Sequence, residues 1–463
     1  MTSPFAPTFE EMLHPHLVDP AVRQRALTAL EVDPLDPVNL MNIHWRTPDG
    51  GVRHFVLPPV LTGVETPIVV LIGKGFPTGS HKVGPAYSVL IESLLAGEFD
   101  PEQHTLVFPS TGNYGIGGAW VSGRMGCKSL VVLPEAMSSE RYDLIRHYGA
   151  GIITTTGSES NVKEIYDEVN RLRRDEPDMR VLNQFDVMGN YRFHYYVTGN
   201  SIVELADELA GKGIGRGKVS AFVSAMGSGG TIAAGDRLKQ VWRDHKIVGL
   251  EPIQCPTLYA NGYGTHDIEG IGDKHVTWIH NVRNMDALMC IDDLACKQGL
   301  RVLNDEVGQD VLKSRYDIDH NTAHQMGDLL GISSICNILG AIKTAKYYNM
   351  GVDDLIVTVA TDAVDRYESV MARMRVDDGA MDSATAVGYI ERVFLGVRTD
   401  WIMSGTLDVR ERWHNLKYFT WVEQQGKSVD ALDAQRDPSW WEMEQQRIGE
   451  IDAHLSQHRR TMS

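Results

Sequence analysis

The chain contains few cysteines, no excess of basic residues and no apolar segment of membrane-spanning length. Its five cysteines are scattered and odd in number, which is typical of free thiols in a reducing compartment and not of a disulfide framework. The formal net charge of −17 argues against nucleic acid or anionic membranes as partners, because both select basic surfaces. Residues 1–19 have neither the apolar core of a signal peptide nor the Arg/Ser bias of a transit peptide. We therefore expect a cytoplasmic protein.

Short apolar runs alternate with segments of helical periodicity from residue 67 onward. At 463 residues the chain is long enough for two or three domains. Alternating strands and helices predict parallel sheets that are covered by helices on both faces, with ligands at the carboxyl ends of the strands. The expected strands are residues 68–72, 105–108, 129–133, 152–155, 219–223, 247–250 and 355–359.

The two ends of the chain differ from this pattern. Residues 1–60 resemble an arm, in which Thr-Pro-Asp-Gly-Gly at 47–51 predicts the turn of a hairpin. Five of the nine tryptophans follow residue 377, where 408–425 and 440–458 have the periodicity of amphipathic helices. Histidine and aspartate cluster in places, but none of these clusters has the spacing of a metal site.

Four short motifs are candidates for chemistry, and each follows an expected strand or opens a helix. A lysine ends Gly-Phe-Pro-Thr-Gly-Ser-His-Lys at 75–82, and Ser-Thr-Gly-Asn-Tyr-Gly stands at 110–115. Gly-Ser-Gly-Gly-Thr at 227–231 lies between a strand and a helix, where glycines and free N–H groups suit an anion. Gly-Ile-Ser-Ser follows at 331–334. Taken one at a time, they also fit a solvated lysine, an Asx turn, a flexible loop and a helix N-cap.

In this order the four motifs resemble the cysteine synthase and cystathionine β-synthase family. These are fold type II pyridoxal-phosphate enzymes, which also include tryptophan synthase β. Pro-Glu-Ala-Met-Ser-Ser-Glu-Arg at 134–141 and Asn-Gln-Phe at 183–185 match the family as well, and the resemblance covers roughly residues 60–375. It implies an α/β fold of two domains, each with a mostly parallel open sheet flanked by helices, plus an extra helical C-terminal segment. The implied domains are an arm at 1–60, a larger cofactor-binding domain at 61–100 and 206–376, a smaller one at 101–205, and an extension at 377–463.

The resemblance implies a set of cofactor contacts. Lys82 would form the Schiff base with pyridoxal 5'-phosphate and move the proton at the substrate α-carbon. His81 would lie by the cofactor phosphate, although a structural role for this histidine is an equal alternative. Asn113 would bond the ring oxygen, and Ser333 would face the pyridine nitrogen with a neutral hydroxyl, which suits β-elimination and β-replacement. The phosphate would be held by Gly227, Ser228, Gly229, Gly230 and Thr231.

The resemblance also implies the substrate contacts. The α-carboxylate needs several convergent donors, which would come from Ser110, Thr111, Gly112 and Gln184. Tyr114 replaces the usual threonine of the family loop. Asp273 follows Gly-Ile-Gly, where most members have a small or aromatic residue, and an exposed loop aspartate is an equal alternative.

The implied function is β-elimination or β-replacement on a cysteine- or serine-like amino acid through an aminoacrylate. A synthase and a lyase outcome both remain open. The enzyme would be a homodimer, as family members are. The alternative is a non-catalytic relative that acts as a binding or regulatory partner, and intact Lys82, Asn113 and glycine-rich loop argue against it.

Overall fold

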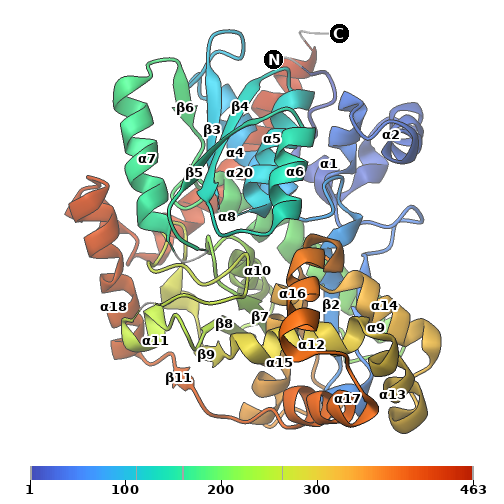
Figure 1. Cartoon of the computed structure of the whole chain (residues 1–463). Helices are drawn as coiled ribbons and strands as arrows, with labels where there is room; N and C mark the ends of the chain where they lie inside the picture. The colour runs from blue at the N-terminus through green and yellow to red at the C-terminus, as the bar shows by residue number, and fades with distance from the viewer. Residues whose placement is uncertain (1–2, 111, 159–160, 263, 461–463) are drawn as a thin grey trace.

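The computed structural model describes all residues except 1–2, 111, 159–160, 263 and 461–463, and it contains two sheets (Figure 1). The larger sheet has seven strands in the order β1-β2-β10-β7-β8-β9-β11. Its five central strands pair in parallel, and β1 and β11 pair antiparallel at the two edges. The strands are β1 His54–Val56, β2 Ile68–Ile72, β7 Ala221–Ala225, β8 Lys246–Pro252, β9 Ala287–Ile291, β10 Ile356–Ala360 and β11 Ile402–Ser404.

The smaller sheet is entirely parallel, with four strands in the order β5-β4-β3-β6. Apolar side chains of α7 repeat at helical spacing and pack on one of its faces in a buried cluster. Its strands are β3 Thr105–Pro109, β4 Lys128–Pro134, β5 Gly151–Thr155 and β6 Met179–Val181. The helices that follow or cover them are α5 Asn113–Arg124, α6 Ser139–His147 and α7 Val162–Asp175.

Helices cover both faces of the larger sheet, as its continuous apolar strands require. Helix α15 is buried along nearly its whole length against the central strands. The α-helices are α3 Pro59–Thr62, α4 Val83–Leu95, α8 Gly189–Phe193, α9 Gly199–Gly211, α10 Ala234–Val241, α11 Thr257–Ala260, α12 Asp293–Asn304, α13 Glu306–Tyr316, α14 His320–Leu329, α15 Ile332–Tyr347, α16 Glu368–Asp378 and α17 Ser383–Tyr389. Shorter helical turns are η3 Gly73–Gly75, η4 His194–Thr198, η5 Thr231–Ala233, η6 Val282–Asn284, η7 Val364–Arg366 and η8 Ile390–Leu395.

The N-terminal arm packs against both α9 and the last helix of the chain. Its predicted hairpin is present, because Arg46 bridges Val52 antiparallel and the Thr47 N–H donates to the Gly51 carbonyl over 2.8 Å. Thr8 and Glu11 form a capping box at α1, and the Asp19 carboxylate caps α2. The arm contains α1 Phe9–Leu13, η1 Pro15–Leu17, α2 Pro20–Val32 and η2 Pro37–Asn42.

The C-terminal segment is helical and lies along the body of the protein (Figure 1). Trp413, Trp421 and Trp441 are buried there, whereas Trp401 is exposed. Its elements are α18 Leu407–Asn415, η9 Phe419–Gln424, α19 Val429–Ala434 and α20 Pro438–Arg460. The predicted fold class, including the extra C-terminal helices, is confirmed. The domain limits stay a prediction.

In the described part of the chain no single helix is both long and apolar enough to cross a membrane. The helices α14 and α15 reach that length and composition only as a pair, and they are bent by 115° at their junction.

Candidate active site

Lys82 lies directly before α4, and its amine reaches the glycine-rich loop. Its Nζ is 3.1 Å from the Ser228 hydroxyl, which also accepts a hydrogen bond from the Asn190 amide over 2.9 Å. The loop begins at the carboxyl end of β7 and leads into η5 and α10. One cavity is lined by Lys82 together with the whole predicted loop, which is Gly227, Ser228, Gly229, Gly230 and Thr231. Two segments that are far apart in the sequence therefore meet at this cavity.

The glycines of this loop are required by close backbone approach. Gly229 has a φ of +75°, and a Cβ there would lie 2.6 Å from the Thr277 hydroxyl oxygen. A Cβ on Gly230 would lie 2.0 Å from the Asn190 side-chain oxygen. The loop thus forms a narrow backbone cradle at the start of a helix, where N–H groups attract anions. This donor set fits the phosphate of pyridoxal phosphate.

His81 is completely buried between Lys82 and the glycine-rich loop. Its Nε2 is 3.2 Å from the Thr231 hydroxyl, and its Nδ1 has no hydrogen-bond partner among the described residues. Burial and the charge of Lys82 hold the pKa of the His81 ring well below its usual value. The ring is therefore neutral at physiological pH, and it touches the loop as the resemblance implies.

The loop after β3 presents Asn113 at the first position of α5. The Asn113 amide donates to the Asp362 carboxylate over 2.6 Å, while its buried Oδ1 has no partner among the described residues. The Ser110 hydroxyl accepts from the N–H groups of Gly112 and Gly115 over 2.9 and 2.8 Å, so it shapes its own loop. Thr111 lies outside the described residues.

Tyr114 and Gln184, which are also predicted to contact the substrate, have hydrogen-bond partners within the protein as well. The Tyr114 hydroxyl donates to the Leu182 carbonyl over 3.1 Å, and the side chain is buried against Phe108. The Gln184 amide is 3.4 Å from the Pro109 carbonyl, directly before the Ser110 loop. The Tyr114 hydroxyl is therefore engaged within the protein.

Ser333 is the second residue of α15 and is buried. Neither serine of the motif is the N-cap, because Gly331 occupies that position and the Ser334 hydroxyl accepts from its N–H over 3.1 Å. The cavity at Lys82 is lined from α15 by Asn337, one turn beyond Ser333, and from the end of β10 by Thr361. Asn337 was missed in the sequence, although its four-residue spacing from Ser333 places both on one helix face.

Asp273 is buried, so its interpretation as an exposed loop residue is wrong. Neither of its carboxyl oxygens has a hydrogen-bond partner among the described residues. Burial raises the pKa of Asp273 to about 7, and the charge of Lys82 acts in the opposite direction. Asp273 lines another cavity, which shares Gly227 with the cavity at Lys82. A carboxyl group that changes its charge near neutral pH is able to accept a proton there.

Comparison with known proteins identifies the family. Residues 74–306 match the family model described as pyridoxal-phosphate dependent enzyme. The chain is 30% identical over 325 residues to a cysteine synthase of Staphylococcus aureus, covering 69% of this chain and 93% of that protein. It is 30% identical over 294 residues to a probable cysteine synthase of Bacillus subtilis, covering 63% of this chain and 85% of that one.

Solved structures agree with this result. A hydrogen sulfide-producing enzyme of Fusobacterium nucleatum is 26% identical, with a TM-score of 0.56 over 70% of this chain and 88% of that chain. An O-acetylserine sulfhydrylase of Entamoeba histolytica is 25% identical, with a TM-score of 0.60 over 75% of this chain and 94% of that chain.

The chain belongs to the family of pyridoxal-phosphate dependent enzymes. The predicted cofactor is thereby confirmed, and so is the predicted class of β-elimination or β-replacement enzymes. The interpretation as a non-catalytic partner is set aside.

Proposed function

We propose that this enzyme acts on a cysteine- or serine-like amino acid and delivers a neutral nucleophile, a thiol or water, to its β-carbon. The cysteine synthases among its relatives support the substrate class. Bound pyridoxal phosphate supplies an electron sink that stabilises negative charge at the substrate α-carbon. In this proposal Lys82 holds the cofactor and moves the α-proton, and the loop at 227–231 holds its phosphate.

Other residues orient the two molecules in this proposal. The neutral His81 would lie by the phosphate, the Asn113 amide would lie by the ring oxygen, and the Ser333 hydroxyl would face the ring nitrogen. The loop at 110–114 and Gln184 surround the substrate carboxylate. A hydroxyl cannot keep the ring nitrogen protonated as a carboxylate would, which suits β-chemistry more than transamination.

The burial and the pKa of Asp273 are the observations that support a neutral nucleophile. Its carboxyl group is buried near Lys82 without a hydrogen-bond partner among the described residues, and its pKa is about 7. An ionised carboxylate repels an anionic nucleophile such as hydrosulfide and accepts the proton of a neutral thiol or water. Asp273 would therefore direct the enzyme away from plain O-acetylserine and sulfide as a substrate pair.

The test combines a substrate panel with an isosteric variant. The enzyme loaded with pyridoxal phosphate is incubated with single amino acids, alone and with thiols. Serine and thioethers report addition of water or a thiol at the β-carbon, sulfide reports the leaving group, and pyruvate with ammonia reports elimination. We expect Asp273→Asn to lower turnover more than about tenfold, equal to ~1.4 kcal/mol of transition-state stabilisation. Asp267→Asn is the matched control, because Asp267 lies in the same loop but is exposed and paired with Lys297. Full activity of Asp273→Asn, with O-acetylserine and sulfide as the best pair, would refute the proposal.

The role of Lys82 is tested separately by covalent trapping. Borohydride reduction of the loaded enzyme should leave a pyridoxyl group on the peptide that contains Lys82, and Lys82→Ala should abolish both the adduct and turnover. An adduct on another lysine would contradict the assignment.

We further propose a cytoplasmic homodimer that binds a small-molecule amino-acid substrate and has no nucleic-acid or membrane partner, with the four domains predicted above. The net charge of −17 supports the absence of a nucleic-acid partner. Light scattering of the full chain tests the dimer, and a monomer at micromolar concentration would contradict it. Truncation after Val376 tests the extension, and a truncated protein that stays dimeric and fully active would exclude a role for it in the interface.

A further inference from the structure

A second cavity of about 380 Å³ lies in the N-terminal arm, between its hairpin, α2 and α9. Its volume falls in the range of about 300–1,000 Å³ that is typical of small-molecule sites. None of its lining residues lines the cavity at Lys82. The polar and charged residues that carry the argument are His14, Arg23, His44, Arg46, Asp49 and Glu204.

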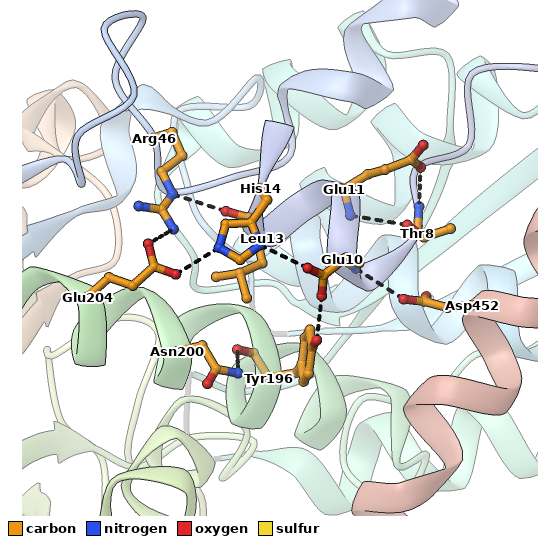
Figure 2. A network of polar contacts seen from close by, with 10 residues as sticks. All are labelled: Thr8, Glu10, Glu11, Leu13, His14, Arg46, Tyr196, Asn200, Glu204 and Asp452. Carbon is orange, nitrogen blue, oxygen red and sulfur yellow. Dashed lines mark hydrogen bonds and ion pairs between the residues drawn. The ribbon is translucent and has the colours of Figure 1, made fainter. Parts of the chain in front are cut away.

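Arg46 is held at the wall of this cavity by two hydrogen bonds (Figure 2). Its Nε donates to the Leu13 carbonyl over 3.0 Å, and its Nη2 donates to the Glu204 carboxylate over 2.6 Å. Its side chain is 9% exposed, and its Nη1 has no partner in the described part of the chain. A fixed guanidinium with one nitrogen left over is well suited to a carboxylate.

His44 adds a second donor to the same wall. Its Nδ1 accepts a hydrogen bond from the Arg46 N–H over 3.1 Å. Burial and the charges of Arg53 and Arg46 hold the pKa of this ring well below its usual value, so the ring is neutral. A neutral imidazole whose Nδ1 accepts a hydrogen bond carries its proton on Nε2.

Negative charge lines the cavity as well. Glu204 accepts from Arg46 through one oxygen and lies 2.9 Å from His14 Nε2 through the other (Figure 2). Asp49 lies at the turn of the hairpin, and Arg23 lies opposite on α2, with its Nη2 3.2 Å from the Pro48 carbonyl. Fixed charges of both signs around one cavity complement a ligand that carries both signs.

We propose that this cavity is a second ligand site, which binds a zwitterionic α-amino acid with its carboxylate on Arg46 and His44 and its ammonium group on Glu204 and Asp49. A purely anionic ligand would meet two carboxylates, and a purely cationic ligand would meet two guanidinium groups. Only the zwitterion pairs both sets.

Trp45 connects this site to the active site, because it lies in the chain between His44 and Arg46, the two residues proposed to bind the ligand's carboxylate. Trp45 is completely buried, and its Nε1 donates to the Thr198 hydroxyl over 2.9 Å. Its ring centroid lies 5.6 Å from that of His81, which precedes Lys82 and contacts the Thr231 hydroxyl. A ligand that binds both His44 and Arg46 thereby restrains the backbone on both sides of Trp45. Occupation of the site should change turnover at Lys82, and this coupling rests on the proposed function.

Binding stoichiometry tests the site without any reference to turnover. The enzyme loaded with pyridoxal phosphate is dialysed to equilibrium against each of the common L-amino acids, with cofactor absorbance recorded in parallel. We expect that two equivalents of at least one amino acid bind per chain. The first equivalent should change the cofactor absorbance spectrum, and the second should not. The N-acetyl and amide derivatives of that amino acid should not occupy this second site, because each lacks one of the two charges.

Three variants test whether the second equivalent binds in the cavity of the N-terminal arm. Glu204→Gln and Arg46→Lys should weaken the second equivalent more than tenfold and leave the first unchanged. Glu208→Gln should keep both, because Glu208 lies one turn further along α9, outside the cavity, and pairs with Lys212. If only one equivalent binds for every amino acid, or if the second survives both cavity variants, the proposal is wrong. If a second equivalent binds but the turnover rate does not change, only the coupling between the two sites is wrong. If the second equivalent binds but no amino acid is turned over, only the proposed reaction is wrong.

Discussion

Replacing Lys417 by methionine should weaken binding of the cofactor, although Lys417 does not line the cavity at Lys82. Lys417 belongs to the C-terminal extension and is completely buried. Its amine donates to the Trp278 and His280 carbonyls over 3.0 and 2.7 Å and to the Gln435 side-chain oxygen over 2.7 Å. The extension thereby holds a segment that follows Asp273 in the chain.

That segment supports the glycine-rich loop. A Cβ on Gly229 would lie 2.6 Å from the Thr277 hydroxyl oxygen and 2.8 Å from the His280 Cβ, so the loop backbone is in close contact with the side chains of this segment. A shift of the 277–280 backbone therefore moves the loop that we propose for the cofactor phosphate.

The magnitude follows from counting the acceptors that lose their donor. The Trp278 carbonyl still accepts from the Gln435 amide over 3.1 Å, and the His280 carbonyl still accepts from the Val282 N–H over 2.9 Å. The Gln435 side-chain oxygen loses the Lys417 amine. An unsatisfied buried acceptor costs about 1–3 kcal/mol. Removal of the buried amine offsets part of this cost. If about 1.4 kcal/mol reaches the loop, the Kd of pyridoxal phosphate rises about tenfold.

The assay is cofactor titration followed by absorbance and tryptophan fluorescence, together with the temperature of unfolding. Lys427→Met is the matched control, because Lys427 lies in the same extension and over the Trp278 ring at 4.8 Å, but it is partly exposed. We expect that Lys417→Met weakens cofactor binding and that Lys427→Met does not. Wild-type cofactor affinity and unfolding temperature in that variant would refute the reasoning.

Three further predictions concern single groups. Gly229→Ala should raise the cofactor Kd more than tenfold, because its φ is +75° and overpacking costs about 1–3 kcal/mol; unchanged titration curves would contradict the close approach. Arg192→Met should lower the free energy of unfolding by about 3–5 kcal/mol, since it leaves the carboxylates of Glu92 and Glu444 buried without their shared cation; a denaturant midpoint like that of wild type would exclude this. Because the pKa of Asp273 is about 7 and a base must be deprotonated, turnover with a thiol should rise about tenfold per pH unit below that value and level off above it. A pH profile that is the same in Asp273→Asn would assign the titration to another group.

The local sequence was sufficient where function depends on residue type at a fixed spacing. The motifs around Lys82 and Gly227 follow β2 and β7 of the larger sheet, and the motif around Asn113 follows β3 of the smaller sheet. Ligands of parallel sheets lie at the carboxyl ends of the strands. The amine, the amide and the backbone cradle could therefore be named together before any contact was known. The hairpin at 47–51 was likewise predictable, because its turn chemistry is local.

Only the tertiary structure decided which side chains are buried and what they face. Asp273 reads equally well as an exposed loop residue, and its pKa near 7 arises from burial by segments distant in sequence. Tyr114 lies in the loop at 110–114, yet its side chain bonds the Leu182 carbonyl. Lys417 lies far in sequence from the carbonyls that it joins, and Arg46 meets Glu204 across 158 positions. Burial and charge pairing are sums over long-range packing, and no local pattern encodes them.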